Sequence, residues 1–272
     1  MDSYDILNGI QDLTAMLDPD ESPGAIAYLN SITFGDELTV DDPYVIACQL
    51  LQCDLPGPLP TAIRDFIEEL FNAAFDAGNA EAMNDLGAQY YDGSRGFEQD
   101  FAKAVNYYKL AAAAGSRQAQ ENLGYCYYYG RNMPIDYEKA FHYFALGAFD
   151  GHLISLYKIG DMYQNGYYVE KNPIEAFHIY SHCLETMTDE AAPTVAGPVF
   201  LRIANAFLNG VGTEEDAKSA LVCFQKAESF LYDMVANGEV MYRKSLQAAI
   251  DGQAKARAKL AAELPHQEWK FD

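Results

Sequence analysis

The sequence predicts an all-α protein, a solenoid of stacked helix pairs. Half of its 272 residues are hydrophobic, including 20 Tyr and 15 Phe, which is enough apolar surface for a large core. A motif recurs along the middle of the chain, for example 36 residues apart at Gly124 and Gly160. Apolar positions within the motif follow helical spacing. A fixed period of this length indicates repeats that bury their apolar faces against their neighbours.

The first half of each repeat predicts one amphipathic helix. Met83, Leu86 and Tyr90 share one helical face and form a core stripe. Gly87 beside that stripe lets a second helix approach closely, and Gly93 fits the left-handed position that ends a helix. The same pattern recurs as Leu123-Gly124, Tyr127 and Gly130, and as Ile159-Gly160, Tyr163 and Gly166.

The second half of each repeat predicts another helix. Its pattern is Lys103-Ala104-Val105-Asn106-Tyr107-Tyr108, and it recurs from Lys139 and from Glu175. A short polar residue stands four positions before the recurring Ala, where its side chain can cap the helix. These capping residues are Asp100, Asp136, Asn172 and Asp216. Each repeat is therefore expected to be two helices joined by a Gly-bearing loop.

The combined pattern L-G-x-x-Y-x-x-G followed by D-x-x-K-A-x-x-Y-[YF]-x-x-A-A-x-x-G resembles the Sel1-like repeat, a relative of the tetratricopeptide repeat. The resemblance implies a right-handed α-α superhelix and adaptor or scaffold roles in protein assemblies. We assign a repeat solenoid to residues 57–235, with repeats at about 79–115, 116–151, 152–187 and 198–235. In the fourth repeat Ala204 replaces Gly and Phe207 replaces Tyr.

The flanking segments are expected to be helical caps. Residues 1–56 form an N-terminal cap with helices at 2–18, 24–33 and 43–53, and 60–77 is the second helix of a degenerate repeat. Residues 236–272 form a C-terminal capping helix and tail, with closing helices over 217–235 and 238–263. Residues 188–198, with two prolines and a glycine, are expected to be an inserted loop.

The charge narrows the class of partner. The formal net charge is −22, from 40 acidic and 18 basic residues, so a phosphate backbone would be repelled and no nucleic-acid partner is expected. No apolar run reaches the ~18 residues of a membrane helix, and the acidic N-terminus does not resemble a signal peptide. We expect a cytoplasmic protein with no membrane partner, whose five cysteines are reduced.

The candidate binding surface is the face of each repeat's first helix that lies opposite the core stripe. Tyrosines and amides dominate this face, which suits a protein or peptide segment with basic or polar side chains. The tyrosines could equally fill gaps between helices, Tyr128 above all. The candidate residues are Asn84, Asp92, Glu121, Tyr125, Tyr129, Tyr157, Asp161, Asn165, Asn205 and Asn209.

Three functions fit the sequence. The first is a scaffold that binds a protein segment through its concave face, and the second is an acidic inhibitor or immunity-type protein that blocks a basic enzyme. The third is a metal-dependent enzyme that uses His142, His178 and His182. No carboxylate motif completes that histidine set and no catalytic motif is present. We therefore favour the scaffold, and expect no enzyme activity, no metal and no cofactor.

Overall fold

The computed structural model describes residues 3–34, 37–40, 42–53 and 58–263. The chain divides into two compact units, Met1–Asp136 and Tyr137–Asp272, and the boundary falls inside the second repeat. Each unit is described by itself.

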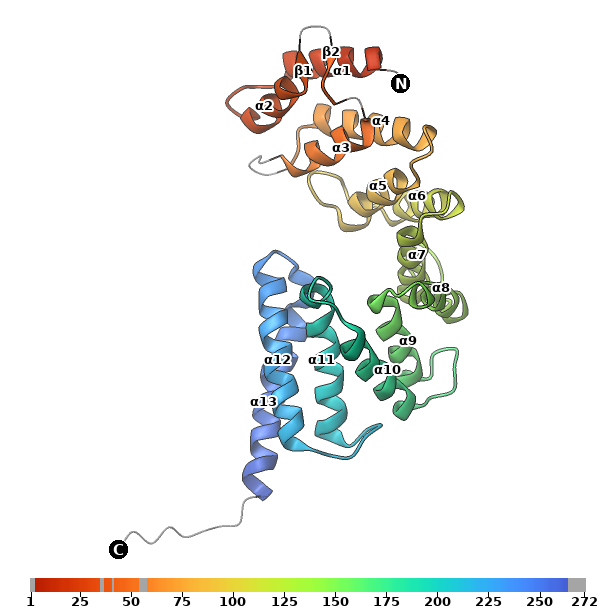
Figure 1. The fold of residues 1–272 in the computed structure, drawn as a ribbon, viewed down its shortest axis with the longest axis vertical. Coiled ribbons are helices and arrows are strands. Elements are labelled where there is room, and N and C mark those ends of the chain that lie inside the picture. Colours follow the sequence, from red (N-terminus) through yellow and green to blue (C-terminus); the bar gives the residue numbers. More distant parts are fainter. Residues whose placement is uncertain (1–2, 35–36, 41, 54–57, 264–272) are drawn as a thin grey trace, which may run out of the picture. The chain divides into compact units, whose positions relative to one another are not determined.

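The first unit is a stack of helices with one short hairpin (Figure 1). The hairpin joins β1 and β2 as antiparallel strands and follows the second helix. Its elements are α1 (Ser3–Met16), α2 (Pro23–Ser31), β1 (Thr33–Phe34), β2 (Glu37–Leu38), α3 (Pro43–Gln52), α4 (Thr61–Asp76), α5 (Ala80–Asp92), α6 (Phe101–Ala113) and α7 (Arg117–Tyr129).

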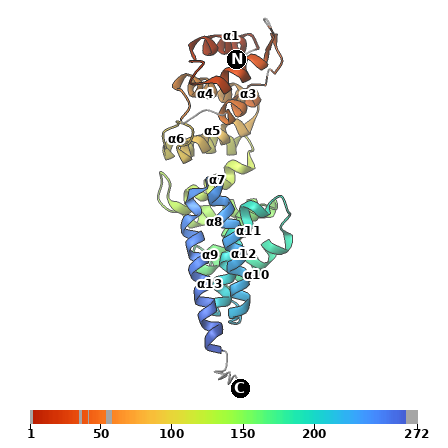
Figure 2. The ribbon, with the colours of Figure 1, turned by 90° about the vertical axis from the view of Figure 1, so that its left-hand side faces the viewer.

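The second unit contains shorter helices followed by three long ones. Figures 1 and 2 both show α11, α12 and α13 running side by side. Its elements are α8 (Tyr137–Phe149), α9 (Leu153–Asn165), α10 (Pro173–Thr186), α11 (Ala192–Asn209), α12 (Ala217–Ala236), the 3-10 helix η1 (Val240–Tyr242) and α13 (Arg243–Glu263).

The helix pairs of the repeats pack as the motif predicts. Leu86 and Tyr90 are buried in the core, and Gly87 faces the ring of Tyr108 on the paired helix. A Cβ at Gly87 would lie 2.8 Å from that ring, and one at Gly160 would lie 2.5 Å from the ring of Tyr180. Both distances are too short for a methyl group. The small residue is therefore required by the approach of the second helix.

The predicted helix ends are confirmed. Gly93 and Gly166 end α5 and α9 in the left-handed conformation, with φ of 65° and 75°. The side chains of Asp100, Asn172 and Asp216 accept backbone N–H groups at the starts of α6, α10 and α12. These caps satisfy donors that a helix leaves unpaired in its first turn.

The loop expected over residues 188–198 is wrong from Ala192 onward, because α11 begins there and continues through Pro198. Pro193 lies in the first turn, where its missing N–H costs nothing. Gly197 packs on Leu231 of α12, which is itself extended to Ala236. The insertion thus lengthens both helices, and the burial of Val195, Ala196 and Val199 offsets the hydrogen bond lost at Pro198.

The last helix covers the end of the second unit's core. Gly252 of α13 lies against the ring of Phe224, and a Cβ there would lie 2.3 Å from it. Ala249 and Ala256 of α13 are buried in the same cluster as Phe224 and Leu231. These small residues let α13 lie close to α12.

Candidate functional site

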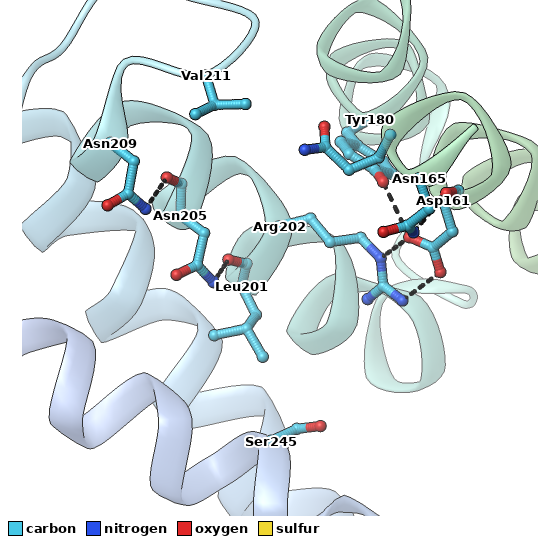
Figure 3. A pocket seen from close by; sticks show the side chains of 10 residues that line it. Asp161, Asn165, Tyr180, Leu201, Arg202, Asn205, Asn209, Val211 and Ser245 are labelled. Atoms are coloured by element: carbon cyan, nitrogen blue, oxygen red, sulfur yellow. Dashed lines mark hydrogen bonds and ion pairs between the residues drawn. The ribbon is translucent and has the colours of Figure 1, made fainter. Parts of the chain in front are cut away.

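A hollow of about 450 Å³ opens between α9 and α11 in the second unit. Figure 3 shows Asn205 and Asn209 one turn apart on α11, opposite the group formed by Asp161, Asn165 and Tyr180. We call this space the hollow. Its lining residues are Asp161, Gln164, Asn165, Tyr180, Leu201, Arg202, Asn205, Asn209, Val211 and Ser245.

A buried ion pair forms one side of the hollow. The Arg202 guanidinium donates through Nε and Nη2 to the two carboxylate oxygens of Asp161, with 2.6 Å between Nη2 and Oδ2. Nη1 of Arg202 donates to the Pro198 carbonyl at 2.8 Å, and the Tyr180 hydroxyl donates to Asp161 Oδ1 at 2.9 Å. The Arg202 guanidinium also lies 4.7 Å from the centre of the Tyr157 ring. The pair therefore ties α9, α10 and α11 together.

The surroundings of Asp161 keep its carboxylate charged. Burial alone would raise the pKa of Asp161, but the guanidinium of Arg202, the ammonium of Lys158 at 3.8 Å and the Tyr180 hydroxyl outweigh it. The pKa of Asp161 is thereby lowered from its ordinary value of 3.8. Conversely, burial and the neighbouring carboxylate raise the pKa of the Tyr180 phenol. Near neutral pH Tyr180 therefore acts as a hydrogen-bond donor.

The wall of the hollow presents amide groups in a fixed orientation. Asn205 donates its Nδ2 to the Leu201 carbonyl, and Asn209 donates to the Asn205 carbonyl, each at 2.8 Å. Asn165 donates in the same way to the Asp161 carbonyl at 2.7 Å. Because a backbone carbonyl can only accept, the amide nitrogens must face the helix. The Oδ1 atoms of three exposed asparagines are thus left as acceptors.

The first unit makes a contact at the equivalent repeat position with different chemistry. Asn122 of α7 donates to Asn84 Oδ1 of α5 at 2.9 Å, and the Tyr44 hydroxyl of α3 donates to Asp85 Oδ2 at 2.7 Å. A smaller hollow of about 360 Å³ lies between α3 and α5. One of its lining residues, Arg95, is anchored through Nη2 to the Cys53 carbonyl at 2.6 Å. This loop arginine holds α3 against the first repeat.

The structure brings four of the ten predicted site residues into one place. Asp161, Asn165, Asn205 and Asn209 line the hollow. In the first unit, Asp92 is exposed and the rings of Tyr125 and Tyr129 stack with centroids 6.2 Å apart. The binding role of these residues stays a prediction.

The expectation of an exposed face is wrong for four of the predicted residues. Asn84, Glu121, Tyr157 and Asp161 are buried, each no more than 8% exposed. The reason is that the first helix of a repeat packs against the first helix of its neighbour as well as its own partner. Asn84 contacts Asn122 in this way, and Asp161 contacts Arg202.

Sequence reasoning missed Arg202, the residue on which the hollow is built. Its repeat position is occupied by Asp85, Asn122 and Lys158 in the other repeats, so no residue type recurs there. What does recur is polarity immediately before the apolar Leu or Ile of the core stripe. A polar residue at that position in every repeat was the available signal.

The histidines do not assemble into a cluster with other metal-binding side chains. His142, His178 and His182 are all exposed, and His182 lies 3.9 Å from Glu185. Across the described ranges, no group of three or more His, Cys, Asp or Glu side chains could hold a metal ion. The five cysteines are free thiols, and burial raises the pKa of Cys126 and of Cys183 to about 12. Such thiols are poor nucleophiles.

None of the helices in the described part of the chain is long and apolar enough to cross a membrane.

Comparison with known proteins identifies the repeat. The Sel1 repeat model matches residues 80–116, 117–152, 153–181 and 201–229, which overlap the four predicted repeats. Two proteins of Arabidopsis thaliana are similar over a short stretch, and both are described as ERAD-associated E3 ubiquitin-protein ligase components. HRD3B is 38% identical over 72 residues, which is 26% of this chain and 12% of HRD3B. HRD3A is 40% identical over 63 residues, which is 23% of this chain and 9% of HRD3A. The matched segment thus spans about a tenth of either relative.

Two solved structures share the fold. A Sel1 repeat protein from Oxalobacter formigenes is 21% identical and superposes with a TM-score of 0.59, covering 97% of this chain and 94% of that one. A protective antigen of uropathogenic Escherichia coli with an SLR fold is 20% identical, with a TM-score of 0.54 over 80% of this chain and 45% of that one. At these identities the likeness concerns the fold alone.

Proposed function

We propose, because the chain belongs to the Sel1 repeat family, that it is a protein-interaction scaffold whose second unit holds an extended segment of a partner protein across α9 and α11. The Arabidopsis relatives are components of a multi-protein ligase, which supports a role in assembly. Repeat proteins use their stacked helices as extended binding surfaces.

The observation that carries the proposal is the oriented amide wall of the hollow. Three asparagines on two consecutive repeats are fixed by their own helices and leave acceptors at the surface. The ion pair of Arg202 and Asp161 fixes the spacing of α9 and α11 beneath them. A surface organised before binding loses little entropy when a flexible segment settles on it.

Site-specific photo-crosslinking tests the proposal. A benzophenone amino acid at Asn205 should capture a partner in cells of the source organism, identified by mass spectrometry of the crosslinked peptide. The matched position is Val222 on α12, which is exposed but does not line the hollow. Equal capture from Val222, or none from Asn205, would reject the hollow as the binding site.

A second candidate, the acidic inhibitor of a basic enzyme, is favoured by the distribution of charge. The first 63 residues contain 11 acidic residues and no Lys or Arg, and the first unit as a whole has 22 acidic and 6 basic residues. Such a field speeds association with a basic protein and is screened by salt. An association rate that stays constant between low and high salt would exclude this function.

A further inference from the structure

We infer that the hollow of the second unit recognises a lysine side chain of the bound segment. The inference rests on the proposed function, since it names the chemistry of the same site. It is specific to the space between α9 and α11 and does not involve the first unit.

The acceptors of the hollow favour a compact cation. The Oδ1 atoms of Asn165, Asn205 and Asn209 have no hydrogen-bond donor among the described residues, because each amide is bonded to its helix only through Nδ2. A lysine ammonium offers three donors and no acceptor, so it can satisfy several such oxygens at once. The planar guanidinium of arginine fits paired carboxylate oxygens better than separate amide oxygens.

The lining also offers apolar surface for the lysine stem. Leu201 lies on α11 beside Asn205, and Val211 follows the end of the same helix and is 37% exposed. A lysine stem covers apolar surface of this kind while its ammonium stays at a polar group. Aliphatic and acceptor groups therefore occur together in one hollow of about 450 Å³.

The cation already in the hollow does not favour an anionic ligand. Two nitrogens of Arg202 are used by Asp161 and the third by the Pro198 carbonyl. The charge of the guanidinium is balanced by a carboxylate that is itself buried. A glutamate of the partner would thus meet three amide oxygens and no available positive charge, within a chain whose net charge is −22.

The test is a titration of the full chain, labelled with ¹⁵N, with four blocked pentapeptides. Each peptide has alanines around a central lysine, norleucine, arginine or glutamate. The side-chain amide signals of Asn165, Asn205 and Asn209 report on the hollow. Asn72 on α4 is the matched control, since it is exposed and donates Nδ2 to the Glu68 carbonyl in the same way, away from the hollow.

The lysine peptide should shift the three hollow signals in a saturable manner and leave Asn72 unchanged. Norleucine lacks the ammonium, so its peptide should bind at least about tenfold more weakly, because charge-assisted hydrogen bonds are the stronger ones. The glutamate peptide should not bind. Asn205→Leu combined with Asn209→Leu should abolish the lysine shifts, whereas Asn72→Leu should not.

The outcomes separate this inference from the proposed function. Norleucine, glutamate or arginine peptides that bind as well as the lysine peptide would overturn the lysine assignment. If no peptide binds while crosslinking at Asn205 still captures a partner, the lysine assignment falls and the scaffold stands. If the lysine peptide binds but crosslinking at Asn205 fails, the scaffold function falls and the amine site stands.

Discussion

The two units use the same repeat position to join neighbouring helices, but with different chemistry. In the first unit the contact between α5 and α7 is a neutral bond between Asn122 and Asn84. In the second unit the contact between α9 and α11 is the ion pair of Arg202 and Asp161. The surrounding charge differs as well, with 22 acidic and 6 basic residues in the first unit against 18 and 12 in the second.

This difference shows that the repeat motif specifies where two helices touch but not how strongly. A neutral amide bond contributes about 1 kcal/mol in net terms. A buried ion pair is weak evidence of extra stability, because desolvation offsets the attraction, yet losing one partner is costly. The second unit is therefore expected to be the more sensitive of the two to single substitutions at this position.

The largest effect is expected from Arg202→Met. The substitution leaves the Asp161 carboxylate buried without its main cation, and should destabilise the second unit by about 2–4 kcal/mol. The equivalent change in the first unit, Asn122→Ala, should cost about 1 kcal/mol. Urea unfolding gives the free energies, and hydrogen exchange followed by mass spectrometry shows which unit loosens.

A double variant separates lost pairing from lost packing. Asp161→Leu added to Arg202→Met removes the orphaned charge and should recover part of the stability. If Asn122→Ala costs as much as Arg202→Met, the ion pair has no special role and the comparison between the units fails.

A medium effect is expected from adding one methyl group at the conserved-type small position of the motif in each unit, Gly160→Ala against Gly87→Ala. The added Cβ would lie 2.5 Å from the Tyr180 ring in the second unit and 2.8 Å from the Tyr108 ring in the first. Overpacking of this kind costs about 1–3 kcal/mol. Gly160→Ala should cost more, because the Tyr180 hydroxyl is held by Asp161 and its ring cannot shift freely. Thermal unfolding of both variants measures the difference, and a larger loss for Gly87→Ala would contradict the reasoning.

The smallest effect is expected from acid, because it is confined to low pH. The pKa of Asp161 is lowered in the folded chain from 3.8, so its stabilising contribution is fully present above that value. The contribution is lost as the pH falls from there through the folded pKa. The difference in unfolding free energy between wild type and Asp161→Asn should therefore be constant from pH 7 to about pH 5 and shrink below pH 4. A difference that grows on acidification would show that Asp161 is not held ionised.

The repeat pattern was sufficient to predict the helices because its signals are local. Leu86 and Tyr90 give the core stripe, Gly93 ends the helix and Asp100 starts the next one, each through contacts within a few residues. The helix over Ala192–Val199 could not be predicted in this way. Pro193 and Pro198 disfavour a helix locally, and only the packing of Gly197 on Leu231 of a distant helix compensates.

The candidate site could be predicted only in part, for a related reason. Asn205 and Asn209 were found because they lie on the face away from the core stripe. Asn84 and Tyr157 share that face but are buried, since a helix wheel does not show the neighbouring repeat. Arg202 was missed because its importance depends on Asp161, a residue 41 positions away.

The lengthening of α11 has a consequence for modular engineering of the chain. Residues added ahead of a helix's first turn extend its axis but leave the angular phase of everything downstream unchanged. Leu201, Asn205 and Asn209 therefore keep their orientation whatever the length of the segment that precedes Ala192. The junction between Met187 and Ala192 is consequently the place where a tag or a spacer can be inserted without rotating the amide wall.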